Sequence, residues 1–137
     1  MAGYSGTPLP KKLGIKAGHR VAFPGAPPQF AAALGELADQ VLVADGEGGA
    51  PLDVVVFFTK RLDDARAAFP RLGPAVAPAG ALWIAWPKRA SGVATDVTED
   101  RVREAGLAAG MVDVKVCTID ETWSGLKFVH RLRDRAR

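Results

Sequence analysis

Residues 52–58 (LDVVVFF) form a run that is apolar apart from one aspartate and rich in β-branched and aromatic side chains. A strand with one face in water alternates apolar and polar residues, whereas a strand covered on both faces does not alternate. The run therefore predicts a strand buried on both faces of a parallel sheet. Such a sheet needs helices over its two faces, so this segment favours the α/β class.

Strand-like and helix-like segments alternate around this run. Further strands are predicted over residues 19–25, 41–44, 80–86, 112–119 and 126–132. Helices are predicted where apolar residues recur at helical spacing: Phe30, Ala33, Leu34, Leu37 and Ala38; Leu62, Ala65 and Phe69; and Val102, Ala105 and Ala109. We expect the second helix to break near Pro70, and the third to be capped by Asp96, with Glu99 three residues further on.

The last two predicted strands are joined only by residues 120–125 (DETWSG), which are too few for a parallel crossover. The sequence thus predicts one Rossmann-like α/β domain over residues 19–137. Its sheet is mostly parallel, with about six strands, helices on both faces and a C-terminal antiparallel hairpin. Residues 1–18 are rich in glycine and proline, and we expect an N-terminal arm with at most a short helix around residues 10–13.

Composition is typical of a single globular domain. The 137 residues are 48% hydrophobic and 24% charged, and Cys117 is the single cysteine, which excludes an intramolecular disulfide. No apolar run approaches the ~20 residues of a membrane-spanning helix, and none follows the first lysines as in a signal peptide. We therefore expect a bacterial-type cytoplasmic protein without a membrane partner.

The net charge of +3 is carried largely by the two ends of the sequence. The basic residues there are Lys11, Lys12 and Lys16, and then Arg131, Arg133, Arg135 and Arg137. A basic tail can attract nucleic acid or another polyanion. No aromatic residues interleave with these arginines, however, so a solvated tail is favoured and nucleic acid is disfavoured as a partner.

The predicted order of elements resembles the class I S-adenosylmethionine methyltransferase fold, whose sheet also ends in an antiparallel hairpin. Residues 52–56 (LDVVV) look like its central strand, and residues 78–84 (PAGALWI) look like its next strand with a Pro-x-Gly lead-in. The resemblance implies that Gly25 belongs to the loop that approaches the cofactor. It also implies that Asp45, 20 residues further on, accepts hydrogen bonds from the ribose hydroxyls.

The segment after the first predicted strand departs from that fold. It reads Pro24-Gly25-Ala26-Pro27-Pro28, so Gly25 alone matches the glycine-rich loop, and Pro27 and Pro28 remove two N–H donors. A helix and a strand are also missing between Asp45 and Leu52. Our first expectation is therefore no cofactor, with S-adenosylmethionine as the alternative.

Three stretches are similar to an uncharacterised bacterial family of short proteins, known only as a domain of unknown function. They are residues 3–8 (GYSGTP) with 11–15 (KKLGI), residues 86–88 (WPK) with 90–96 (ASGVATD), and residues 120–126 (DETWSGL). This similarity spans the whole chain and implies no activity.

The strongest candidate site is the segment 86–96, because open α/β sheets bind ligands at the carboxyl ends of their strands. Its candidate ligand-binding residues are Lys88 and Arg89 for charge, Ser91 and Thr95 for hydroxyls, and Gly92 for its backbone freedom. We expect them to converge with Lys11 or Lys12 on one positive cleft for a small anion or nucleotide. In the competing interpretation these basic side chains are solvated and Asp96 is only a helix cap.

A second candidate is the hairpin loop, where Asp120 and Glu121 beside Trp123 could orient a cation or cover a ligand. The competing interpretation, that Trp123 merely covers the end of the sheet, is favoured.

Cysteine and histidine suggest no catalytic or metal site. A hairpin register with a sum near 245 would place Cys117 and His130 on one face, but neither an acidifying environment nor a third orienting group is visible. A packed cysteine is therefore favoured. Two histidines and one cysteine match no recognised zinc spacing, so we expect no metal.

Three functions remain open. The first is a non-catalytic ligand-binding or regulatory domain for a small anion or nucleotide. The second is an S-adenosylmethionine-dependent methyltransferase. The third is a partner-binding module that uses its basic termini on nucleic acid or protein. The glycine-poor loop favours the first over the second, so catalysis is disfavoured and no catalytic residue is assigned.

Overall fold

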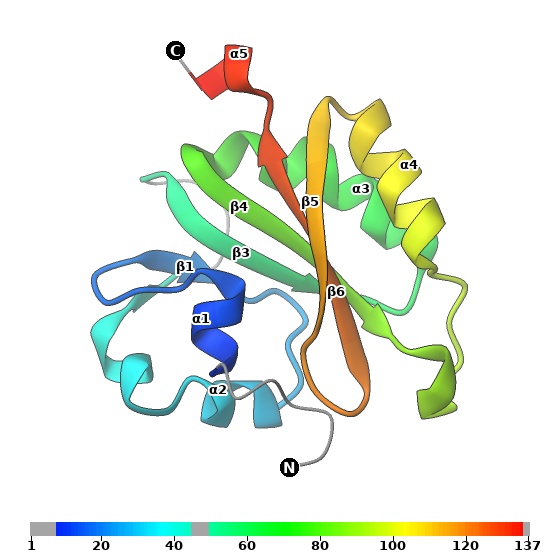
Figure 1. The fold of residues 1–137 in the computed structure, drawn as a ribbon, viewed down its shortest axis with the longest axis horizontal. Coiled ribbons are helices and arrows are strands. Elements are labelled where there is room, and N and C mark those ends of the chain that lie inside the picture. Colours follow the sequence, from blue (N-terminus) through cyan, green and yellow to red (C-terminus); the bar gives the residue numbers. More distant parts are fainter. Residues whose placement is uncertain (1–7, 45–49, 136–137) are drawn as a thin grey trace.

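The computed structural model describes residues 8–44 and 50–135 (Figure 1). Its first half contains α1 (Leu9–Leu13), β1 (Arg20–Ala22), α2 (Gln29–Ala33), the 3-10 helix η1 (Gly35–Gln40), β2 (Leu42–Val43), β3 (Leu52–Phe58) and α3 (Leu62–Leu72). The second half contains η2 (Gly73–Ala75), β4 (Val76–Pro87), η3 (Arg89–Ser91), α4 (Glu99–Ala108), β5 (Met111–Thr118), β6 (Trp123–His130) and α5 (Leu132–Arg135).

The strands of the described residues form one six-stranded sheet in the order β2-β1-β3-β4-β6-β5. The first four are parallel, and β6 runs antiparallel to both β4 and β5. The predicted α/β class, the mostly parallel sheet and the C-terminal hairpin are therefore confirmed. The strand order reverses between β1 and β3, because β2 lies on the outer side of β1 and β4 on the outer side of β3.

Two apolar layers cover the sheet, one on each face. The first layer places Leu82, Ile84 and Trp86 of β4 against the buried sides of α3 and α4. The second places Ala81, Trp83 and Ala85 of β4 against α1 and α2. Residues 54–58 of β3 are all buried, as their lack of alternation predicts. The helices lie on both sides of the sheet (Figure 1).

Residues 9–15 pack against the sheet. Leu13 is completely buried and Ile15 almost so, and the indole N–H of Trp83 donates to the carbonyl of Leu13 at 3.1 Å. The short helix predicted there is present as α1, because burying Leu13 and Ile15 fixes it on the sheet.

Two predicted helix boundaries are wrong. The helix after Pro28 ends at Ala33, and a 3-10 helix continues from Gly35, whose φ of +58° is left-handed. Ala33 and Ala38 are consequently exposed, although Phe30 and Leu34 are buried as predicted. The next helix does not break at Pro70 but continues to Leu72. Leu72 is buried, and its packing offsets the hydrogen bond that Pro70 cannot make.

The hairpin register corrects the interpretation of Cys117 and His130. Cys117 pairs with Gly125 and His130 with Met111, near opposite ends of the hairpin, so the two side chains do not meet. A shift between Asp113 and Lys115 moves the register sum to 241 on one side and 242 on the other. Strand β6 also starts earlier and ends earlier than predicted, at Trp123 and His130, and α5 follows.

Within the described residues no helix is long and apolar enough to cross a membrane.

The contact between α4 and β6 generates the first prediction. A Cβ at Gly106 would overlap the ring of Phe128, which is completely buried. In Gly106→Ala, overpacking costs roughly 1–3 kcal/mol and exceeds the gain of up to about 1 kcal/mol in helix propensity. Urea unfolding should show a lower free energy of unfolding. In a Phe128→Leu background the same change should cost less, and an unchanged or raised stability in the natural background would contradict this packing.

Candidate functional site

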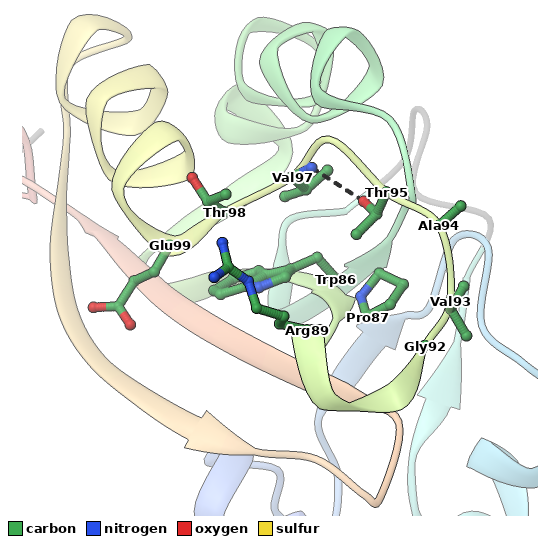
Figure 2. Close-up of a pocket in the computed structure, with 10 residues that line it drawn as sticks. All are labelled: Trp86, Pro87, Arg89, Gly92, Val93, Ala94, Thr95, Val97, Thr98 and Glu99. Atoms are coloured by element: carbon green, nitrogen blue, oxygen red, sulfur yellow. Dashed lines mark hydrogen bonds between the residues drawn. The ribbon is translucent and has the colours of Figure 1, made fainter.

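A pocket of about 430 Å³ opens at the carboxyl end of β4 (Figure 2). Strand β4, η3, the following loop and the start of α4 line it with Trp86, Pro87, Arg89, Gly92, Val93, Ala94, Thr95, Val97, Thr98 and Glu99. It thus lies in the segment that the sequence singles out, and takes three of the predicted residues there: Arg89, Gly92 and Thr95.

The first half of the loop is shaped by its own side chains. The Ser91 hydroxyl donates to the carbonyl of Lys88 at 2.6 Å and accepts from the N–H of Val93 at 3.2 Å. Gly92 has a φ of +78°, which reverses the chain after η3. Ser91 therefore serves the loop itself and does not line the pocket, whereas Gly92 provides the backbone freedom expected of it.

The second half of the loop is tied to the start of α3. The Thr95 hydroxyl donates to the carbonyl of Lys60 at 2.6 Å and accepts from the N–H of Val97 at 3.1 Å, the bond drawn in Figure 2. The Asp96 carboxylate accepts from the N–H of Leu62 at 2.7 Å. These bonds hold one wall of the pocket against the loop that follows β3.

The sequence predicts that Asp96 caps its own helix, and this prediction is wrong. Thr98 is the N-cap of α4 and accepts from the N–H of Arg101 at 3.3 Å. Asp96 instead satisfies the first N–H of α3, where the N-cap residue Arg61 offers no side-chain acceptor. The same carboxylate thus caps a helix 34 residues earlier in the chain.

The pocket combines an apolar wall with one cation at its rim. Trp86 and Val97 are buried in the layer beneath α3 and α4. Arg89 is exposed and has no ion-pair partner among the described residues. Glu99, by contrast, accepts from Arg103 at 2.6 Å, and this carboxylate together with Asp113 raises the pKa of Arg103. The charge at Arg89 is thus available to a ligand.

The other predicted cations do not line this pocket. Lys88 is half-buried, and its backbone N–H donates to the carbonyl of Thr122 in the hairpin loop at 2.7 Å. Lys11 and Lys12 lie on α1, which packs on the layer of Trp83, whereas the pocket belongs to the layer of Trp86. The structure therefore does not bring α1 and the pocket together on one face of the sheet.

The hairpin loop serves a structural role at two of its three candidate positions. Asp120 accepts from the N–H groups of Thr122 and Trp123, both at 2.8 Å, which closes the turn. Trp123 is buried and packs edge-on against Phe58, with ring centroids 5.1 Å apart. Glu121 is exposed. This arrangement supports the interpretation in which Trp123 covers the end of the sheet.

The turn after β1 lies against the end of β3. Gly25 has a φ of +74°, and a Cβ there would come within 2.5 Å of the carbonyl oxygen of Phe58. The N–H of Phe58 donates to Pro24 at 2.9 Å, and that of Ala26 donates to Phe23 at 3.1 Å. Gly25 is thus required by close contact within the chain. Asp45, the other predicted cofactor residue, lies outside the described residues, as do Arg137 and the side chains of Arg133 and Arg135.

Seven lining residues are absent from the predicted site residues: Trp86, Pro87, Val93, Ala94, Val97, Thr98 and Glu99. Trp86 and Val97 carry the strand and helix patterns of core residues, and Thr98 and Glu99 carry those of a helix start. The signal that could have found them is the position of the whole segment after a central parallel strand.

Comparisons with known proteins support the fold and no narrower identity. No family model matches the chain, and no curated protein matches its sequence. Its structure is similar to an S-adenosylmethionine-dependent methyltransferase from Aquifex aeolicus, with 15% identity, a TM-score of 0.62, and 86% of this chain and 85% of that chain covered.

Two further solved structures give the same result. One is a putative type 11 methyltransferase from Sulfolobus solfataricus, with 14% identity, a TM-score of 0.60, and 90% of this chain and 89% of that chain covered. The other is a magnesium protoporphyrin IX methyltransferase from Synechocystis PCC 6803 with bound SAH, with 16% identity, a TM-score of 0.54, and coverage of 84% and 75%. The chain therefore has the Rossmann-like fold of these methyltransferases.

The bond from Leu62 to Asp96 generates the second prediction. Replacing Asp96 with alanine leaves the first N–H of α3 without its acceptor and should lower the free energy of unfolding by about 0.5–2 kcal/mol. Asp96→Asn should retain most of the stability, because the amide oxygen still accepts. Hydrogen exchange at Leu62 should accelerate in the alanine variant only. The control is Glu104→Ala, which removes an exposed carboxylate from α4; equal effects of the two alanine variants would contradict the cap.

Proposed function

We propose that this chain binds S-adenosylmethionine at the carboxyl edge of its sheet and acts as a methyltransferase. The observation that carries the proposal is the strand order, which reverses between β1 and β3 within a fold similar to methyltransferases over most of the chain. Open α/β sheets bind their ligands beside such a reversal. The magnesium protoporphyrin IX enzyme with this fold carries bound SAH.

The residues at this edge fit such a ligand, although they offer few backbone N–H donors. Gly25 is exposed, and its backbone N–H is not used elsewhere in the described chain. Pro24, Pro27 and Pro28 have no N–H, so Gly25 would be the backbone donor towards the carboxylate of the methionine moiety. Asp45, which follows β2, would accept from the ribose hydroxyls.

When bound, S-adenosylmethionine supplies a methyl group on a sulfonium, ready for transfer to a nucleophile. The part of the chain would be to bind and orient the acceptor in the pocket after β4. Trp86 and Val97 offer it an apolar wall, and Arg89 offers a cation at the rim. A planar molecule that carries a carboxylate or phosphate suits this combination.

The third prediction tests the cofactor. Calorimetric titration of the full chain with S-adenosylmethionine and S-adenosylhomocysteine should show binding. Asp45→Ala should weaken it roughly 10- to 100-fold, the usual effect of losing hydrogen bonds to a charged acceptor. Glu47→Ala removes a carboxylate from the same segment and should leave the affinity unchanged. The absence of binding of either compound at millimolar concentration would exclude the proposal.

Two observations favour a second function: few backbone N–H donors lie between Pro24 and Pro28, and the charge of Arg89 is available to a ligand. In it the chain is a non-catalytic binding domain, and a small anion or nucleotide occupies the pocket after β4. This function requires no cofactor at the turn that contains Gly25, so the two proposals make different demands on the same protein.

The fourth prediction separates them. Under the second function, phosphate should stabilise the chain thermally, by about 1.4 kcal/mol, or roughly 5 °C, at ten times its dissociation constant. The double variant Lys88→Ala with Arg89→Ala should abolish this stabilisation. Lys60→Ala, which removes an exposed cation outside the pocket lining, should preserve it. Phosphate stabilisation that survives the double variant would place the anion elsewhere.

A further inference from the structure

Three lysines from three different elements gather on the face of the sheet opposite the pocket. Lys115 of β5 and Lys127 of β6 are direct partners in the hairpin register, so their side chains leave the same face. Lys127 in turn pairs with Trp83 of β4, which belongs to the layer beneath α1. Helix α1 packs on this same face, because Leu13 and Trp83 belong to one layer.

Lys12 joins this pair from α1. The thiol of Cys117, two residues from Lys115 and on the same face, feels the charges of both Lys12 and Lys115. Both charges act to lower its pKa, although burial raises that pKa by more. We define the lysine cluster as Lys12, Lys115 and Lys127, with Cys117 of β5 on the same face.

The lysine cluster has no acidic counterpart. Like charges placed directly opposite each other on neighbouring strands destabilise a sheet. Burial and, to a lesser extent, the charge of Lys115 lower the pKa of Lys127. Among the described residues no carboxylate lies within ion-pair distance of the three lysines. Asp113, the carboxylate of β5, is bonded to Arg103 of α4 at 2.9 Å, on the far side of the sheet.

We propose that the lysine cluster binds the phosphates of a nucleic-acid strand without reading its sequence. The three lysines line neither the pocket after β4 nor two other pockets, of about 420 and 340 Å³, so an isolated phosphate at the cluster would stay largely hydrated. Affinity on such an open surface must come from several phosphates that contact several lysines at once. The proposal is independent of the pocket after β4.

The residue types favour nucleic acid over an acidic protein. A lysine ammonium binds phosphate as a point charge in many orientations, whereas protein–protein interfaces are enriched in arginine and depleted in lysine. The cluster consists of lysines alone. The large exposed hydrophobic side chains among the described residues are aliphatic, so binding at the cluster would rest on phosphate contacts and not on base stacking. Contacts to the backbone alone predict binding that does not depend on sequence.

The experiment measures the salt dependence of binding by fluorescence anisotropy, with labelled single-stranded RNA and DNA of about 20 nucleotides. Each phosphate contact contributes a slope of about 0.7 to the plot of log affinity against log salt for single strands. The double variant Lys115→Gln with Lys127→Gln should therefore reduce the slope by about 1.4 and the affinity roughly 25-fold at 0.1 M salt. The matched control, Lys60→Gln with Arg61→Gln, removes two exposed charges outside the cluster. It should change the slope and the affinity much less.

Cys117 provides a second measurement, because it is the single cysteine of the chain. Bound nucleic acid should slow its alkylation by a maleimide in the natural chain and in the control, but not in the double variant. The double variant removes a like-charge repulsion, so urea unfolding should find it at least as stable as the natural chain. Equal loss of affinity in both double variants would overturn the proposal. The proposal would also be overturned if polyglutamate of the same charge competed for the protein as well as RNA does. That result would indicate that the cluster binds an acidic protein.

Discussion

The burial of β3 and β4 on both faces is the constraint on which the rest of the structure depends. The parallel register from Val54 with Ala81 to Phe58 with Ala85 places two consecutive apolar strands side by side at the centre of the sheet. Water must be excluded from both of their faces, so α3 and α4 cover one face and α1 and α2 the other. Polar groups then have room mainly at the carboxyl ends of these strands, where the pocket lies.

The periodicity of the sequence was sufficient to predict the mostly parallel sheet and its final hairpin, but not the order of the strands. A missing alternation identified β3, helical spacing identified the buried sides of α3 and α4, and a short connection identified the hairpin. The errors lie where a local pattern permits two structures. Asp96 and Thr98 can both cap a helix, and the choice between them depended on Leu62, whose N–H lacks a nearby acceptor. No local pattern contains that contact.

The pocket shows the same limit. Its place in the sequence could be predicted, since segment 86–96 follows a central strand, and Arg89, Gly92 and Thr95 do line it. The segments that lie beside the pocket could not be predicted. Lys11 and Lys12 were expected beside it, yet α1 packs on the opposite layer because Leu13 and Ile15 are buried there. The side of a sheet that a short helix covers depends on tertiary packing, which a single sequence does not display.

Strand β4 relates the two surfaces that we propose as binding sites. Side chains alternate along a strand, so Trp86 and Trp83 leave β4 on opposite faces. Trp86 lines the pocket, whereas Trp83 anchors α1 through the carbonyl of Leu13 and is the cross-strand neighbour of Lys127. Both tryptophans are held in tightly packed apolar layers. Binding on one face would therefore affect the other face through a shift of β4. The pairing of β4 with β3 and β6 resists such a shift. The geometry thus favours two surfaces that are occupied independently, with a rigid strand between them.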